Sequence, residues 1–338
     1  MAIGDAALSL AFGAGIITVI LLIINQFGKG TDIKTPLKWL IRIFCGLLVF
    51  DLSLLTYYFL TSNFTINYVW TFSSRDLPVL YKLSGVLAGQ QGTLLFWAVF
   101  IGLSSLWLSE RREVNDFIKK SQIVLLTLGV FFIGLTIKDS PFNTIYHLYP
   151  DLLKSFVPPD GNGLNPLLID PWMAVHPPVI FIAYGAMGIP FAFAVVHLFK
   201  SLTDSSEKFH KVWIKDVIMW CRVSWIFLTL GIAVGGFWAY KVLGWGGFWS
   251  WDPVETSSLV PWFLLTGALH ALIEHKKDRT NYTILSPLMV ALSFTLVLYA
   301  TLVTRSGFFE SVHAFGVGET GLYILIMTTA SALLPLIL

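Results

Sequence analysis

Aromatic side chains are dense in residues 241–255, which read Lys-Val-Leu-Gly-Trp-Gly-Gly-Phe-Trp-Ser-Trp-Asp-Pro-Val-Glu. Trp245, Trp249 and Trp251 fall within seven residues, and Trp238 precedes them closely. Flat rings grouped in one place can stack on a large, flat, apolar ligand. An aromatic belt at a membrane interface would instead spread Trp and Tyr over many helix ends. The crowding therefore favours a binding platform, with these four tryptophans as candidate binding residues.

The residues after the tryptophans carry a helix-start signal. Asp252 suits the N-cap, Pro253 suits the first helical position, and Glu255 can reach back to the Asp252 amide in a capping box. A helix is predicted to begin here, and both acids are candidates for holding the loop; Asp252 is counted with the binding residues for this reason. Three glycines give the loop backbone conformational freedom: Gly244, Gly246 and Gly247.

Two histidines are candidate iron ligands at the same side as this loop. His176 precedes Pro177 and Pro178, which restrict the backbone and predict that a helix starts there. The positive end of a helix dipole disfavours an imidazolium, and neutral imidazole is the form that binds iron. His313 lies in a segment between two apolar runs. Either histidine alone would more often be structural, but two of them beside an aromatic cluster favour axial ligation of a haem.

His270 is different because it lies inside a long apolar run. Ionisable residues at membrane depth are costly and by default indicate function. A second, embedded metal cofactor with His270 as a ligand is one hypothesis; a histidine hydrogen-bonded between helices is the alternative. Asp51, near the middle of another run, is expected to pair with a polar group or relay protons.

Composition and apolar runs define the class of protein. The chain has 338 residues, of which 56% are hydrophobic and 12% charged, whereas soluble domains carry about 25% charged residues. We therefore predict an all-α, polytopic membrane helix bundle. The whole of residues 1–338 is expected to be one transmembrane haem-handling domain. Nine runs are long enough to cross a membrane: 6–27, 39–61, 92–108, 122–137, 179–199, 217–240, 256–274, 283–304 and 319–338.

Basic residues predict the orientation. One set of connecting segments carries sixteen Lys and Arg residues, and the other set carries six. The positive-inside rule places the richer set in the cytoplasm, so the N-terminus is expected outside and the C-terminus inside. The outer segments are then roughly 62–91, 138–178, 241–255 and 305–318, so His176 and His313 lie on the same side as the aromatic loop. The net charge of +2 reflects this bias and indicates no nucleic-acid partner.

The remaining cysteines and histidines indicate no further chemistry. Cys45 and Cys221 lie inside apolar runs, and the chain has no CxxC motif for dithiol chemistry or covalent haem attachment. His210 and His275 lie on inner basic segments and are expected to be solvated, and His197 near an inner helix end is expected to be structural. His147 lies in an outer segment with no supporting pattern.

Several motifs in this order resemble the CcmF family, the haem lyase subunit of the multi-subunit cytochrome c maturation system. The segment from Phe237 to Glu255 resembles the family's WWD signature, and Gly89-Gln-Gln-Gly-Thr-Leu-Leu-Phe-Trp97 resembles a segment entering a span. The stretches ending in His176-Pro-Pro and containing Ser311-Val-His313 match those that carry the family's two outer haem histidines. Thr266-Gly-Ala-Leu-His270 matches a ligand of an embedded b-type haem.

The resemblance implies a haem lyase. Haem b, delivered by a haem chaperone, would sit at the outer membrane face between His176 and His313, and two thiols of a CxxCH motif in apocytochrome c would add to it. No side chain is assigned as a general acid or base. The alternatives are a haem carrier or exporter of the WWD family, and a polytopic transporter with an aromatic belt. The Arg305–Phe315 segment matches the lyase and argues against the carrier.

The resemblance also implies what this chain lacks. Family members are about twice as long, and their C-terminal half supplies the second ligand of the embedded haem b. Expected partners are therefore the haem chaperone, apocytochrome c, membrane lipid and other maturation subunits, including a separate C-terminal half. The expected location is a prokaryotic plasma (inner) membrane, ahead of a mitochondrial inner membrane.

Overall fold

The computed structural model describes residues 3–27, 34–111, 115–202, 213–244, 246–277, 282–311 and 320–338. Nearly all regular structure in these ranges is helical, apart from one isolated bridge between Ile66 and Thr144. The helices of the described ranges include nine that are long and apolar enough to cross a membrane. The prediction of an all-α polytopic bundle is confirmed. The chain divides into two compact units.

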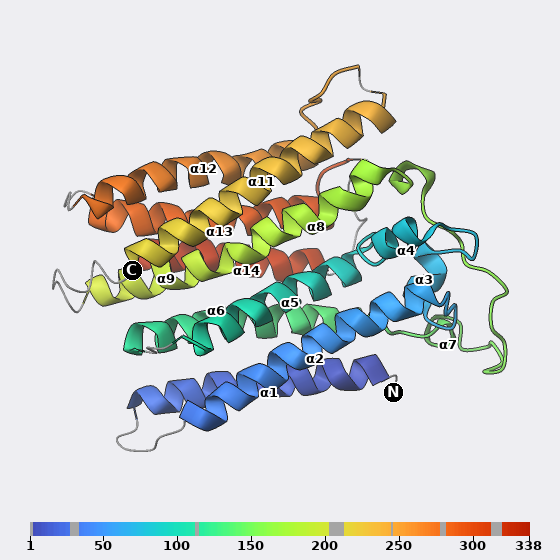
Figure 1. The fold of residues 1–338 in the computed structure, drawn as a ribbon, viewed down its shortest axis with the longest axis horizontal. Coiled ribbons are helices and arrows are strands. Elements are labelled where there is room, and N and C mark those ends of the chain that lie inside the picture. Colours follow the sequence, from blue (N-terminus) through green and yellow to red (C-terminus); the bar gives the residue numbers. More distant parts are fainter. Residues whose placement is uncertain are drawn as a thin grey trace. The chain divides into compact units, whose positions relative to one another are not determined.

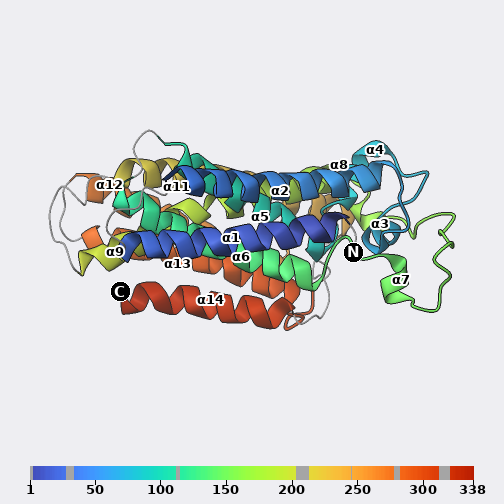
Figure 2. The ribbon, with the colours of Figure 1, turned by 90° about the horizontal axis from the view of Figure 1, so that it is seen from below.

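Unit 1 comprises Met1–Glu110, Leu126–Phe181 and Lys241–Leu243. The long helices α1 (Ile3–Phe27) and α2 (Lys34–Leu60) pack against each other, and α2 also packs against α5 (Gln90–Ser109). Figures 1 and 2 both show α1 and α2 side by side. The other elements are α3 (Asn67–Phe72), α4 (Val79–Gly85), α7 (Ile145–Leu148), the 3-10 helix η1 (Pro166–Leu168), most of α6 (Asp116–Lys138) and the start of α8 (Pro171–Ala186).

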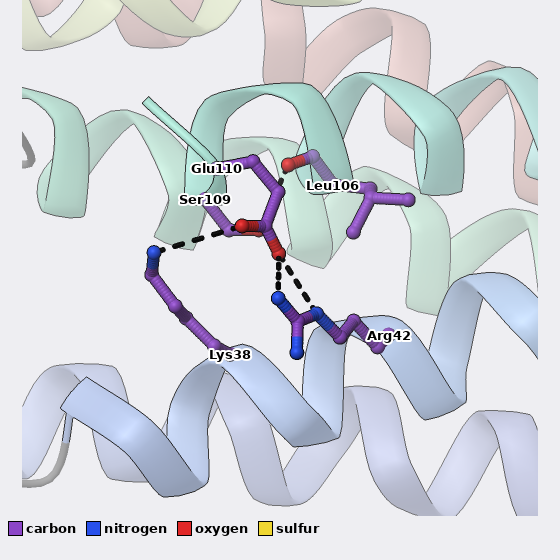
Figure 3. Close-up of polar contacts among 5 residues, drawn as sticks. All are labelled: Lys38, Arg42, Leu106, Ser109 and Glu110. Atoms are coloured by element: carbon purple, nitrogen blue, oxygen red, sulfur yellow. Dashed lines mark hydrogen bonds and ion pairs between the residues drawn. The ribbon is translucent and has the colours of Figure 1, made fainter. Parts of the chain in front are cut away.

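An ion-pair cluster ties α2 to the end of α5 (Figure 3). The Arg42 guanidinium meets Glu110 Oε1 through both Nε and Nη2 at 2.8 Å, and Lys38 Nζ lies 3.6 Å from Glu110 Oε2. The hydrogen bond from Arg42 and the charges of both basic residues hold the pKa of the Glu110 carboxyl below its usual range. Lys38, Arg42 and Glu110 belong to segments that the sequence predicts to be inner. Glu110 therefore partly neutralises the positive charge of these segments.

Unit 2 comprises Arg111–Leu125, Ile182–Tyr240 and Gly244–Leu338. Its helices are α9 (Gly188–Ser201), α11 (Ile214–Val242), α12 (Pro253–Lys276), α13 (Tyr282–Arg305) and α14 (Thr320–Ile337). Helix α13 is central, because it packs against α12, α14 and α9. Helices α11 and α12, which flank the aromatic loop, are joined by reciprocal bonds: the indoles of Trp225 and Trp262 donate at 2.8 Å to Thr266 and Thr229, respectively.

All nine predicted spans correspond to helices, and most helix ends differ from the predicted ones by a few residues. The fifth differs more. Helix α8 starts at Pro171, so Pro177 and Pro178 lie inside the helix and not at its entry as predicted. Asp170 explains this earlier start because its side chain and carbonyl accept the Trp172 and Ala174 amides. The helix is then interrupted at Met187, where Pro190 lacks the N–H that would bond back to Ala186.

Candidate functional site

The start of α12 holds one end of the aromatic loop. Asp252 Oδ2 accepts the Val254 amide at 2.9 Å and Pro253 occupies the first turn, as predicted. Glu255 does not form the predicted capping box. Its Oε2 instead accepts the backbone amide and the hydroxyl of Ser250, at 3.0 and 2.9 Å. Because Trp251 has a left-handed backbone, the chain reverses here and presents Ser250 to Glu255.

Trp251 is held in an unusual conformation. Its φ is +61°, a region that is costly for a bulky residue, and its side chain is 71% exposed. Trp249 meets it edge to face, with ring centroids 6.4 Å apart. Gly244 and Gly246 also have positive φ, which confirms the predicted freedom at these two glycines. The backbone conformation of the loop thus leaves the Trp251 ring exposed.

The other aromatic residues divide into two groups. Phe248 is half exposed and lies on Gly236 of α11, where an added Cβ would be 3.1 Å from its ring. Trp238, a predicted binding residue, is only 4% exposed within unit 2. Trp262 stacks on Trp225 between α11 and α12, so it belongs to the helix packing. Trp245 lies outside the described residues.

A second contact ties the loop to the segment after α13. The Ser311 hydroxyl donates to Asp252 Oδ2 at 2.8 Å, the same oxygen that caps α12. The Ser306 hydroxyl accepts the Phe308 amide at 3.2 Å, which shapes the turn in between. His313 lies outside the described residues, two positions beyond Ser311. The sequence did not identify Ser311; the Asp-Pro helix start gave no sign that its carboxylate serves a second donor.

His176 lies in the second turn of α8 and is half buried. The helix start before it is fixed by Asp170, whose Oδ1 accepts the Trp172 amide at 2.8 Å and whose Oδ2 meets Lys241 Nζ at 2.6 Å. Burial raises the pKa of the Asp170 carboxyl, but the bonds from Lys241 and from the Trp172 amide outweigh it and hold the pKa below its usual range. His176 belongs to unit 1, whereas Trp249, Trp251 and Asp252 belong to unit 2.

His270 lies on α12 and is exposed, beside the exposed apolar side chains of Phe263 and Ile273. This helix face is available for another apolar surface. Within the part of the chain that the structure describes, no group of three or more His, Cys, Asp or Glu side chains could hold a metal ion. The assignment of His270 as a haem ligand therefore stays a prediction.

The prediction that His275 is solvated is wrong. His275 is 5% exposed because α12 continues to Lys276 and turns this side chain inward, where its Nδ1 lies 2.7 Å from Ser286 Oγ of α13. Its ring also lies 5.9 Å from that of His197, which is buried as expected and packs on Trp213. His147 is exposed on α7, and His210 lies outside the described residues.

Buried groups in the spans match the predictions only in part. Cys45 and Cys221 are free and buried, as expected of small apolar side chains. Asp51 is fully buried, and neither carboxylate oxygen has a hydrogen-bond partner among the described residues. The expected polar partner of Asp51 is thus not found in these ranges.

Comparison with known proteins decides the family. Residues 87–309 match the family described as "Cytochrome C assembly protein". The chain belongs to this family. The match includes His176, the aromatic loop and His270, and it ends before Ser311 and His313.

Individual relatives agree. The chain is 35% identical over 285 residues to the cytochrome c-type biogenesis protein ccl1 of Rhodobacter capsulatus, and 36% identical over 278 residues to CcmF of Haemophilus influenzae. These alignments cover 83% and 80% of this chain but 41% and 40% of the relatives. The chain thus spans less than half the length of the curated relatives that it matches. The predicted resemblance to CcmF is confirmed.

A solved structure supports the fold. The structure of "Cytochrome c Heme Lyase CcmF" is similar to this chain with a TM-score of 0.78 at 24% identity, over 98% of this chain and 50% of that one. At this identity the likeness establishes the arrangement of helices alone.

Proposed function

We propose that this chain acts in cytochrome c maturation, as a haem lyase subunit that works within a complex. It would hold haem b at the aromatic loop, with His176 and His313 as axial ligands, and promote thioether attachment to the CxxCH motif of apocytochrome c. The whole of residues 1–338 would serve this one task. The loop would face the outer side of a prokaryotic plasma membrane, with the N-terminus outside and the C-terminus inside.

The exposed indole of Trp251 carries this proposal. A large apolar ring that is 71% exposed, on a backbone with φ near +61°, is costly unless something covers it. Two polar contacts fix the loop that carries the ring, from Ser250 to Glu255 and from Ser311 to Asp252. A flat porphyrin suits such a preorganised aromatic surface, and Trp245 and Trp249 would complete its surroundings, while the buried Trp238 would support the site through helix packing.

The proposed reaction is balanced without a further reactant. Each cysteine thiol adds across one haem vinyl group: a C–S bond and a C–H bond form, while the S–H bond and the C=C π bond are lost. The protein's task is to hold haem and peptide in register, since such positioning is worth up to about 7–11 kcal/mol. The haem chaperone would supply the haem, and other maturation subunits would present the apocytochrome.

The exposed position of His270 supports a second haem site. We propose that His270 is one axial ligand of an embedded haem b and that another chain, equivalent to the C-terminal half of the longer relatives, brings the second. The apolar face around Phe263 and Ile273 would receive that chain together with lipid. A histidine at membrane depth gains from such a partner, because an unsatisfied polar group there costs several kcal/mol.

Visible spectra and covalent-haem staining test the outer site. The chain is coexpressed with its maturation partners and an apocytochrome, as wild type and as His176→Ala, His313→Ala and the exposed control His147→Ala. Each histidine-ligand variant should lower haem content or change the axial ligation, and should reduce stained cytochrome, while the control matches wild type. Unchanged spectra in both ligand variants would refute the site. Normal haem binding without any thioether formation would instead indicate a carrier.

A further inference from the structure

Asp170 is the best-anchored polar residue near the start of α8. It is 5% exposed, and its two carboxylate oxygens have different partners: Oδ1 accepts the Trp172 amide at 2.8 Å and Oδ2 meets Lys241 Nζ at 2.6 Å. Its carbonyl oxygen accepts the Ala174 amide at 3.0 Å. One residue therefore caps the helix and links it to the end of α11.

Two prolines weaken the backbone hydrogen bonding in the first two turns of α8. Pro177 and Pro178 have no N–H, so the carbonyls of Met173 and Ala174 lose their helical donors. Residues 171, 172 and 175 are exposed. His176 directly precedes the two prolines, and the capped start of the helix lies six residues before it.

Lys241 supplies the charge that completes the anchor. It lies in the last turn of α11, where a cation is favourable, and Asp170 lies at a helix start, where an anion is favourable. Asp170 is ionised at neutral pH, and these contacts lower the pKa of its carboxyl further below its usual range. In the sequence, Lys241 stands four residues before Trp245.

We propose that Lys241 is a positioning residue for His176: by pairing with Asp170 it sets where this histidine stands as an axial haem ligand. The inference rests on the proposed function. The inference extends the proposed function to Lys241, which would act through Asp170 and the start of α8 and not by contact with the haem.

The test is an imidazole competition on the haem-loaded complex. Free imidazole is titrated against purified protein, and the concentration that displaces half of the native ligation is read from the visible spectrum per mole of haem. Lys241→Met, Asp170→Asn and their double variant are compared with Lys241→Arg and with the control Lys154→Met, an exposed outer-segment lysine for which no ion pair is found among the described residues. An asparagine side chain can still cap the helix, so both single variants remove mainly the ion pair.

The expected shift is moderate because the Lys241 side chain is 51% exposed and its pair is partly screened. Lys241→Met and Asp170→Asn should each lower the half-displacing concentration about threefold to tenfold, and the double variant should match either single one. Lys241→Arg should restore most of the difference, and Lys154→Met should equal wild type. The visible spectrum of His176→Ala separates the positioning role of Lys241 from the ligand role of His176.

Three results overturn the inference. If Lys241→Met and Asp170→Asn give the same imidazole titration as the wild type while His176→Ala alters the ligation, Lys241 has no positioning role and the proposed function stands. Additive effects in the double variant show that Lys241 acts through something other than Asp170. An unaltered spectrum in His176→Ala removes His176 as an axial ligand, and with an unaltered spectrum in His313→Ala it removes the proposed outer haem site. If Lys241→Met accumulates poorly, Asp170→Asn gives the same decision, because spectra are compared per mole of bound haem.

Discussion

Asp252 should hold the aromatic loop by geometry and not by its charge. Its Oδ2 accepts the Val254 amide at 2.9 Å and the Ser311 hydroxyl at 2.8 Å, and its carbonyl accepts the Thr256 amide at 2.9 Å. Replacement by Ala removes the cap, worth about 1 kcal/mol, and one further hydrogen bond, also about 1 kcal/mol. Asp252→Ala should therefore destabilise the start of α12 by about 2 kcal/mol.

Hydrogen exchange measured by mass spectrometry in detergent can read this loss at the Thr256 amide. The acceptor of that amide is the Asp252 carbonyl, which survives every substitution at position 252, so faster exchange reports opening of the helix start. At 1.36 kcal/mol per tenfold, Asp252→Ala should speed exchange about 30-fold, and Ser311→Ala about fivefold. Asp252→Asn should stay within about fivefold of wild type, because Asn caps as well as Asp and one amide oxygen can accept both bonds.

Two outcomes would refute this reasoning. Wild-type exchange in Asp252→Ala would show that the carboxylate does not hold the helix start. Haem loss in Asp252→Asn with unchanged exchange would show that the charge acts on the ligand itself. A further check is the double variant Asp252→Ala, Ser311→Ala. Its Thr256 amide should exchange no faster than in Asp252→Ala alone, because that substitution has already removed the Asp252 carboxylate to which the Ser311 hydroxyl donates.

Four further outcomes follow from the structure. Trp251→Ala should weaken haem retention about threefold to tenfold beyond the loss of buried area, without changing membrane insertion, because an aromatic contact is worth about 0.5–1.5 kcal/mol; haem washout rates check this. Gly236→Ala should be nearly neutral in thermal unfolding, since better helix propensity offsets a tight contact with the Phe248 ring at 3.1 Å, whereas Gly236→Val should lower the unfolding temperature. The difference in unfolding temperature between wild type and Asp170→Asn should persist above the usual aspartate pKa of about 3.9 and shrink as pH falls through the lower pKa of the folded state, because a depressed carboxyl pKa stabilises only the ionised form. His270→Ala should abolish the b-type spectrum of the complex with its second chain and leave the outer haem in place.

The helices were predictable because long apolar runs leave few alternatives. Charged residues and prolines mark their ends, and Asp252-Pro253 located the start of α12 correctly. The start of α8 was missed although Asp170-Pro171 is the same signal. Pro177 and Pro178 drew the prediction six or seven residues too far along, because proline is commoner at a helix entry than inside a helix.

Side-chain partners were less predictable, because they depend on which helix faces pack. His275 follows the apolar run and precedes two lysines, so its sequence surroundings indicate a solvated residue. Its burial depends on the extra turn of α12 and on neighbours from other elements, among them Ser286 on α13 and Trp213. The contact between Ser311 and Asp252 joins residues 59 positions apart, and no local pattern specifies it.

The two Asp-Pro helix starts have the same capping chemistry, but only one of them also needs the negative charge of the aspartate. Asp170 and Asp252 each cap a helix with one carboxylate oxygen, but Asp170 gives its second oxygen to the ammonium group of Lys241, whereas Asp252 serves a hydroxyl through the capping oxygen itself. An amide can replace the carboxylate in a cap and toward a hydroxyl, but it cannot form the ion pair. Substitution by Asn should therefore have a moderate effect at position 170 and a mild effect at position 252. This contrast separates the role of the charge from that of the helix cap at equivalent positions of two helices.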